Sequence, residues 1–300
     1  MSNELLLRRR ELLLKRQEEM NIRAVCFEAD GEQTVAITKV GSAPAITMQY
    51  SYNGVTWESW DLTALPFGGS TKVYVRGVGN ERLGADDKNY NIITFSTDAF
   101  VYVSGIVESL LDGENEVLTL GKNYILGNLF YKQTALRSAK DLGFEAKSIA
   151  NNVVSVYSRM FDGCTNLLYA PKVLPVTTLA SHCYRYMFSG CTSLVNAPEL
   201  PATTLSSYCY RDMFRNCSSL VNAPELPATT LMKQCYQNMF YGCTSLKTVR
   251  CRAKVTASSA ITYWLYGVSP SGTFYGHSEY GWATGASGIP SGWEFVELTD

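Results

Sequence analysis

The sequence is poor in charged side chains and in histidine, and it has no long apolar run. Asp, Glu, Lys and Arg make up 18% of its 300 residues, and the formal net charge is −1. A chain so close to neutral is not expected to have nucleic acid or an anionic membrane as its main partner. No uninterrupted apolar stretch approaches the roughly 20 residues that span a bilayer, so we also expect no membrane insertion.

The patterns of common catalytic and metal sites are also missing. Only two histidines, His182 and His277, are present, and there is no CxxC pair, P-loop, dinucleotide fingerprint, nucleophile elbow or HExxH. Paired carboxylates such as Glu199 and Glu225 stay open as an alternative, although a solvated strand edge accounts for them, since each stands beside proline once per repeat. We therefore expect a protein that is not an enzyme and has no cofactor and no metal.

What the sequence does contain is a repeat. Met-Phe pairs begin at Met160, Met187, Met213 and Met239, at spacings of 27, 26 and 26 residues. The words MFxGCTSL and NAPELPATTL recur with these pairs. A fixed period of this size predicts one supersecondary unit per repeat, stacked on its neighbours as a solenoid with a shared core.

The pattern inside one copy predicts a short helix followed by two short strands. Cys209, Met213 and Phe214 stand at i, i+4 and i+5, which is the spacing of a buried helix face. Asn216, with Gly190 at the equivalent place, would end the helix in a left-handed conformation. The prolines of NAPELPATTL restrict the strands to brief, interrupted segments.

These repeats resemble the BspA-type leucine-rich repeats of Bacteroidetes surface proteins and of the phages that infect those bacteria. The resemblance rests on MFxGCTSL and NAPELPATTL and covers residues 160–246, about a third of the chain. It implies a leucine-rich repeat solenoid. It is specific for the repeat family and implies no biochemical activity.

The segments around the repeats complete an expected α+β architecture. Residues 1–21 repeat leucines every seven positions and predict an N-terminal helix for docking or oligomerisation. The alternatives are an amphipathic helix lying on its own domain, or membrane-surface binding through Arg8, Arg9 and Arg10. No secretory signal is recognised there.

Three further domains follow this helix. Residues 22–105 are rich in short β-like runs, and Asn53-Gly54 marks a hairpin, so we expect a small antiparallel β-sandwich. Residues 106–250 are expected to be the leucine-rich repeat solenoid, beginning with an atypical N-terminal cap at 106–156. Residues 251–300 are expected to be a C-terminal β cap with one last helix at 261–266.

Several aromatic residues have two readings. Trp57 and Trp60 in the sandwich are either core or a sugar site, and core is favoured. The aromatic residues of the C-terminal segment either seal the array or form an exposed binding tip. They are Tyr263, Trp264, Tyr266, Tyr275, Trp282 and Trp293. Tyr184, Tyr210 and Tyr236 share one repeat position and are either packing or a strip for glycans.

Eight of the nine cysteines fall in two repeat columns or just after them, between Cys164 and Cys251. Disulfides between turns are one alternative. Small, reduced and buried core residues are the other, and we expect it because cysteine packs well in a tight core.

The repeat positions that vary around the constant core are the candidate binding residues. They are Arg185, Tyr186, Arg211, Arg215 and Tyr241. The expected function is that of a phage virion structural protein, a fibre-type subunit or adhesin that presents the repeats for host recognition. Its expected partners are further copies of the chain through the N-terminal helix, other virion proteins, and a glycan or protein of the host surface. Its expected location is the virion; a bacterial cell-surface adhesin and an accessory module of a carbohydrate-active enzyme are alternatives.

Overall fold

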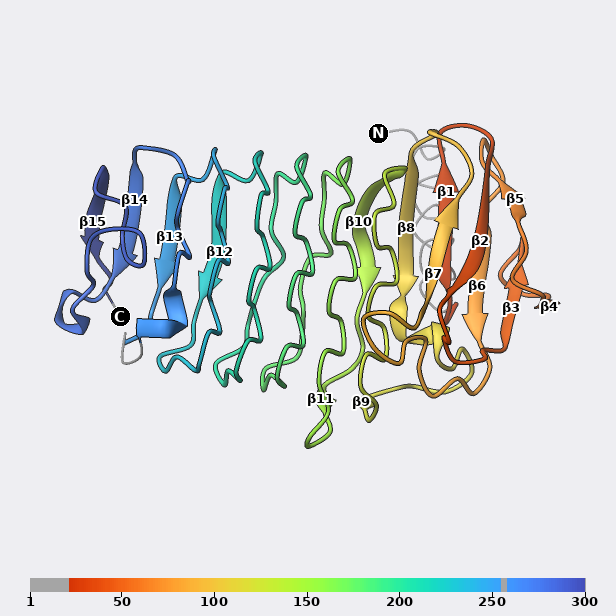
Figure 1. Cartoon of the computed structure of the whole chain (residues 1–300). Coiled ribbons are helices and arrows are strands. Elements are labelled where there is room, and N and C mark those ends of the chain that lie inside the picture. Colours follow the sequence, from red (N-terminus) through yellow and green to blue (C-terminus); the bar gives the residue numbers. More distant parts are fainter. Residues whose placement is uncertain (1–21, 255–257, 300) are drawn as a thin grey trace, which may run out of the picture.

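The computed structural model describes residues 22–254 and 258–299, and this part of the chain is almost entirely β. An antiparallel β-sandwich stands at one end and passes into an elongated solenoid of stacked coils (Figure 1). The strands are β1 (Val25–Ala29), β2 (Gln33–Val40), β3 (Met48–Ser51), β4 (Glu58–Trp60), β5 (Leu65–Phe67), β6 (Val73–Gly77), β7 (Tyr90–Phe95), β8 (Val101–Ile106), β9 (Thr119–Leu120), β10 (Leu136–Gly143), β11 (Ser148–Ile149), β12 (Asn222–Leu226), β13 (Thr248–Cys251), β14 (Gly272–Gly276) and β15 (Trp293–Glu297).

The only helical elements among the described residues are three short 3₁₀ turns. They are η1 (Val107–Leu110), η2 (Ser258–Ile261) and η3 (Ser278–Tyr280). The α+β class expected from the sequence is therefore wrong. The expected N-terminal helix at 1–21 lies outside the described residues. The expected last helix at 261–266 is wrong, since Ile261 ends η2 and residues 262–266 form turns.

The sandwich is built from two sheets that pack face to face. A six-stranded sheet has the order β10-β8-β1-β6-β3-β4, and a three-stranded sheet has the order β5-β2-β7. Strands β1 to β8 pair antiparallel within these sheets. Phe27 of β1 contacts Phe67 of β5 and Phe95 of β7 across the interior, with ring centroids 6.3 and 5.7 Å apart. These rings form the centre of the sandwich core.

The hairpin at Asn53-Gly54 is longer than a two-residue turn. The last paired residues of β3 and β4 are Tyr50 and Glu58, and the loop lies between them. The Asn53 side chain accepts hydrogen bonds from the backbone N–H groups of Val55 and Thr56, both at 2.8 Å. The Asn53-Gly54 pair therefore predicts where the hairpin loop lies but not how long the loop is.

The solenoid continues the sandwich without a break in the core. Strand β10 pairs in parallel with β8, so the first coil adds a strand to the six-stranded sheet. One cluster of buried apolar residues runs from Val25 to Trp293. The division into segments 22–105, 106–250 and 251–300 stays a prediction.

Each coil replaces the expected helix with a chain of β-turns. In the coil of Met213, alternate N–H groups bond within the coil, as from Met213 to the Tyr210 carbonyl at 3.2 Å. The N–H groups between them bond to the next coil, as from Phe214 to the Met239 carbonyl at 2.9 Å. An α-helix would direct all of these N–H groups along its own axis, so the coils are joined by bonds that helices could not make.

Left-handed residues recur every fourth position along these turns. Tyr208, Asp212 and Asn216 have φ of 61°, 57° and 60°. The third residue of a type II turn needs such a φ. Side chains consequently point inward in pairs, and Met213 and Phe214 form one such buried pair. The sequence spacing i, i+4, i+5 reflects this four-residue repeat rather than a helix.

Identical residues of successive coils stack into columns inside the solenoid. The rings of Phe130, Phe161, Phe188, Phe214 and Phe240 are parallel, with centroids 5.3 to 5.6 Å apart. A second column holds Tyr157, Tyr184, Tyr210 and Tyr236 at 5.5 to 6.0 Å. Both columns are buried, so the tyrosine column is packing and not a surface strip for glycans.

All nine cysteines are free and buried, as expected for reduced core residues. Those of the first column also make a regular bond. Cys191 Sγ lies 3.1 Å from the Phe161 carbonyl, and Cys217 Sγ lies 3.0 Å from that of Phe188. Each thiol therefore donates to the phenylalanine carbonyl of the preceding coil and adds a polar link between coils.

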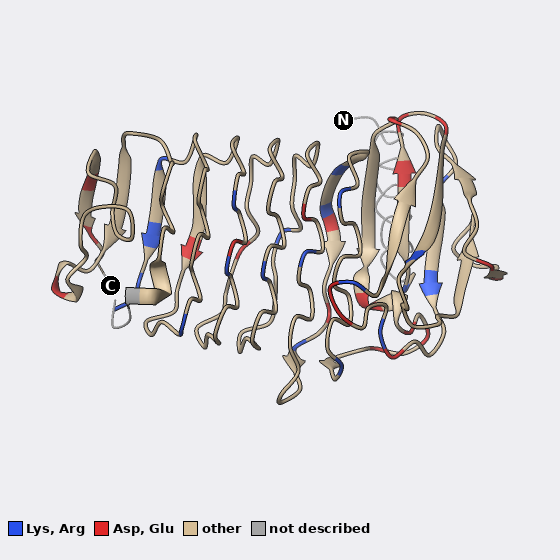
Figure 2. Ribbon diagram, viewed as in Figure 1, with Lys and Arg blue, Asp and Glu red and all other residues tan. Residues whose placement is uncertain are grey.

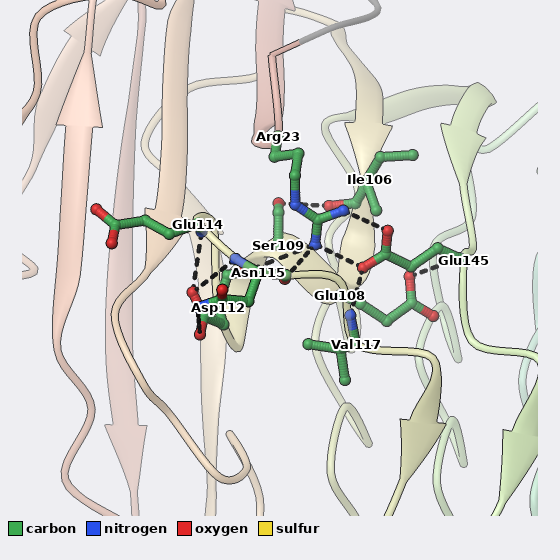
Figure 3. A network of polar contacts seen from close by, with 9 residues as sticks. All are labelled: Arg23, Ile106, Glu108, Ser109, Asp112, Glu114, Asn115, Val117 and Glu145. Carbon is green, nitrogen blue, oxygen red and sulfur yellow. Dashed lines mark hydrogen bonds and ion pairs between the residues drawn. The ribbon is translucent and has the colours of Figure 1, made fainter.

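A polar network joins the sandwich to the first coils. Figure 3 shows Arg23, just before β1, reaching Glu145 beyond β10; its Nη2 atom lies 2.6 Å from Glu145 Oε1. Nearby Glu108 is fully buried, accepts the Tyr157 hydroxyl at 2.6 Å and accepts the Glu145 N–H at 3.0 Å. Burial raises the pKa of Glu108 to about 7, against the lowering effect of these bonds.

Candidate functional site

The surface formed by the turns offers one outward pair of side chains after each inward pair. We call this surface the turn face; it comprises residues 155–163, 181–190, 207–216 and 233–242. All five sequence-predicted binding residues lie in these ranges and are half-buried. The structure thus places them on one kind of surface, in successive coils.

One group on this face is built around Tyr186. The Arg159 guanidinium lies 4.3 Å from the centroid of the Tyr186 ring, and that of Arg185 lies 4.8 Å from it. Arg159 also pairs with Asp162 at 2.8 Å. Arg185 has no carboxylate partner among the described residues, and its Nε atom is buried without a hydrogen bond. Tyr186 and Arg185 are therefore the members of this group that form no ion pair with a described carboxylate and contribute least to the stability of the fold.

A second group surrounds Asp212, which is fully buried. Arg211 Nε lies 3.2 Å from Asp212 Oδ2, and Arg215 Nη1 lies 3.3 Å from Oδ1. Asn238 of the next coil donates to the same Oδ1 at 3.0 Å. A buried carboxylate must keep such partners, so Arg211 and Arg215 contribute to folding as well as to the surface.

Tyr241 extends the second group into the following coil. The Arg215 guanidinium lies 4.8 Å from the Tyr241 ring, and that ring stacks on Tyr266 at 5.3 Å. Tyr263 meets Tyr266 edge-on at 5.9 Å. Tyr263 and Tyr266 are about half exposed, so the coil that follows the turn face displays aromatic surface.

His182 lies between the two groups. Its ring stacks on Tyr208 at 4.5 Å, and its Nδ1 atom is 2.7 Å from the Ser181 hydroxyl. The pKa of His182 is lowered by burial and by the charges of Arg185 and Arg211. A neutral imidazole at this place leaves the arginines as the positive charges of the surface.

These contacts define an arginine–tyrosine strip, a name we keep for Arg159, Arg185, Tyr186, Tyr208, Arg211, Arg215, Tyr241 and Tyr266. Arg159 and Tyr208 were not among the binding residues predicted from the sequence, and Tyr266 was named there only as a residue of the C-terminal segment. The signal that finds them is the ring or charge directly above them in the next coil. Such contacts need the register of the coils, which the sequence alone leaves open.

The strip carries groups that suit the binding of a ligand. Guanidinium groups recognise carboxylate, sulfate and phosphate oxygens, and tyrosine rings pack against apolar faces of a ligand. Figure 2 shows that basic and acidic residues both occur along the solenoid. Within the described part of the chain, no group of three or more His, Cys, Asp or Glu side chains could hold a metal ion.

The opposite, strand-bearing part of the coils carries an open groove of about 600 Å³. It lies between residues 195–201 and residues 222–227 and includes Glu199 and Glu225. Strand β12 pairs with β13, whereas no β-bridge joins it to the coil before it. Glu225 accepts a hydrogen bond from Arg252 Nε at 3.0 Å, which fits the solvated strand edge expected for these carboxylates.

Of the two sandwich tryptophans, Trp60 belongs to the core. It is buried, and its indole N–H donates to the Thr63 carbonyl at 2.8 Å. Trp57 is half-buried and lies under the Arg76 guanidinium, 4.2 Å from it. These two rings do not form one aromatic platform.

Comparison with known proteins agrees with this architecture. Residues 138–263 match the family model described as BspA type leucine rich repeat region, in six copies. The match supports the leucine-rich repeat family for the solenoid, and such a repeat region indicates a surface or adhesin-like role in protein interaction. A search of curated proteins and a search of solved structures found no match. No helix among the described residues is long and apolar enough to cross a membrane.

Proposed function

We propose that the protein is a non-enzymatic structural component of a phage virion, a fibre-type subunit or adhesin that presents its solenoid to the host surface. The observation that carries this proposal is the arginine–tyrosine strip. It displays charged and aromatic side chains that vary from coil to coil, on a core whose buried residues are nearly the same in each coil. A surface of this kind changes its ligand by substitution without loss of the fold.

The partner expected at the strip is a host glycan or protein with acidic groups. Arg185 supports this best, because its charge is not balanced by a carboxylate among the described residues. Tyr186 beside it supplies a ring for an apolar part of the ligand. Repetition along successive coils favours an elongated ligand that touches several coils at once.

Attachment to the particle belongs to the same proposal. Residues 1–21, outside the described part of the chain, would dock on other virion proteins or assemble copies of the chain through their seven-residue leucine repeat. The described chain begins in the sandwich beside the first coils, so attachment through residues 1–21 would leave the later coils and the C-terminal end free to meet the host (Figure 1).

The alternative is a bacterial cell-surface adhesin, which the same family match and the same strip also support. Mass spectrometry of phage particles purified from an infected Bacteroidetes culture separates the two. Peptides of this chain at stoichiometric levels in the particles would support the virion. Peptides confined to envelope fractions of uninfected cells would contradict it and favour the cellular adhesin.

A further inference from the structure

We infer that the C-terminal end of the solenoid carries a binding pocket for a neutral sugar, at a site separate from the arginine–tyrosine strip. The pocket has a volume of about 280 Å³, near the lower end of the ~300–1,000 Å³ range of ligand sites. Two indoles, one phenyl ring and three hydroxyl groups line it: Trp282, Trp293, Phe295, Ser278, Thr284 and Ser291.

Trp282 is the last ring of a stacked column. Tyr236 stacks on Trp264 at 6.2 Å, and Trp264 stacks on Trp282 at 5.6 Å with 12° between the planes. The column ends there, since among the described residues no further ring lies parallel on Trp282, and Trp282 lines the pocket. An indole with one covered face is a platform for the C–H face of a sugar ring, which packs on aromatic surface as another apolar ring would.

The walls of the pocket are held in place before any ligand arrives. The Trp264 indole N–H donates to the Gly288 carbonyl at 2.9 Å and fixes the loop that carries Thr284. The Trp293 indole N–H donates to the Ser269 carbonyl at 2.8 Å. Phe274 meets Trp282 edge-on at 4.7 Å. A pocket with fixed rings loses little side-chain entropy on binding.

The lining indicates a ligand that is polar but uncharged. Among the described residues, no ionisable side chain lines the pocket. The Glu297 carboxylate accepts the N–H of Ser278, one of the lining residues, at 3.0 Å. Hydroxyl groups both donate and accept, so Thr284 and Ser291 suit the hydroxyls of a sugar, while an acidic ligand would lack a cationic partner.

The test uses the purified full chain on an array of neutral and acidic glycans, followed by calorimetric titration with the best neutral oligosaccharide. We expect neutral glycans to bind and acidic glycans to be no better. Trp282→Ala should lower the affinity by at least about tenfold through loss of stacking. Thr284→Val, which keeps the shape of the side chain and removes the hydroxyl, should lower it about threefold or more.

Tyr169→Ser is the matched control, because Tyr169 is an exposed aromatic that belongs neither to the pocket lining nor to the arginine–tyrosine strip. It should bind the sugar as the parent does. Thermal melts show whether Trp282→Ala is folded. If it is not, the sugar affinities of Thr284→Val and Trp282→Phe test the pocket instead. Absence of neutral glycan binding, preference for acidic glycans or proline-rich peptides, or parental affinity in Thr284→Val would overturn the inference. These readouts need no virus particle, so they succeed or fail independently of the virion proposal.

Discussion

The cysteine column shows how single residues link the coils. Each thiol donates to a phenylalanine carbonyl that also accepts a backbone N–H from its own coil. The Phe188 carbonyl, for example, accepts the backbone N–H of Cys191 in the same coil and the thiol of Cys217 in the next coil. Burial raises the pKa of the Cys217 thiol well above its ordinary value, so it stays protonated and remains a donor.

Replacement of Cys217 by Asp should unfold the neighbouring coils. The Asp side chain would be fully buried with no cation in contact, and such a change costs at least about 3–5 kcal/mol. Cys217→Ala removes only the sulfur and its weak bond and should cost about 1–2 kcal/mol. Urea unfolding followed by circular dichroism measures both, and a parental midpoint for Cys217→Asp would contradict the buried ladder.

Glu108 should make stability depend on pH. Its pKa in the folded protein is about 7, above the ~4.3 of a free glutamate. A carboxyl whose pKa is raised by folding binds a proton more tightly in the folded state. Its favourable contribution is therefore complete below about pH 4 and is lost as pH rises through about 7.

We expect the free energy of unfolding to fall between pH 5 and pH 8, by an amount on the order of 1–3 kcal/mol. Glu108→Gln keeps the shape and a polar group for Tyr157 but cannot ionise, so its stability should vary less over this range. Thermal melts of both proteins at several pH values provide the measurement. Equal pH profiles for the two proteins would show that Glu108 does not titrate there.

At the scale of elements, the repeat period is readable in the sequence and the local conformation is not. In a helix a side chain points to the same face again after 3.6 residues, and in these turns it does so after four. The spacing of Cys209, Met213 and Phe214 is too short to distinguish the two periods. The distinguishing residues would be those with positive φ. Gly190 and Asn216 fit that requirement, but Tyr208 at an equally left-handed position gives no compositional sign of it.

The substitution Gln234→Gly distinguishes the β-turn conformation from an α-helix, because it is expected to change the free energy of unfolding in opposite directions in the two. Gln234 has a φ of 52°, a conformation that costs a non-glycine residue about 1–2 kcal/mol. Glycine relieves that cost, so stability should stay the same or rise by up to about 1 kcal/mol, after its own entropic penalty. Inside a helix the same change would lower stability by about 1 kcal/mol. A urea titration decides, with Gln234→Ala as the control that should not stabilise.

The sandwich follows from the sequence more closely than the coils do. Alternating apolar runs mark the places of β1, β2, β6, β7 and β8, because burial on one face imposes a two-residue period. Residues 55–57 have the composition of a β-like run but precede the strand, which is β4 at Glu58–Trp60. Its start is set by the side-chain bonds of Asn53, which lengthen the hairpin loop.

At the scale of the whole molecule, the sequence predicts which residues share the candidate binding surface but not the contacts within it. Arg185, Tyr186, Arg211, Arg215 and Tyr241 all lie on the turn face because core and surface positions keep their places in every copy. That Arg211 and Arg215 hold a buried Asp212 depends on three-dimensional register. The tip pocket depends on a loop folding back over Trp264, and no repeat predicts that.

Some residues of the strip contribute to stability and others do not, and this difference determines which substitutions test its binding role. Changing Arg211 or Arg215 would leave Asp212 with fewer partners and confuse binding with folding. Arg185→Gln unpairs no described carboxylate. Tyr186→Asn suits its φ of 58°, because asparagine adopts left-handed conformations readily. This pair of changes should leave the unfolding midpoint nearly unchanged.

The most direct test of the proposed function is the binding of the purified, labelled chain to cells of the proposed Bacteroidetes host. The parent should bind saturably, and the Arg185→Gln, Tyr186→Asn double variant should bind at least about tenfold more weakly, as when two contacts at the centre of an interface are lost. Val173→Ser, at an exposed apolar residue outside the turn face, should bind as the parent does. Parental binding by a folded double variant would contradict the claim that the arginine–tyrosine strip meets the host.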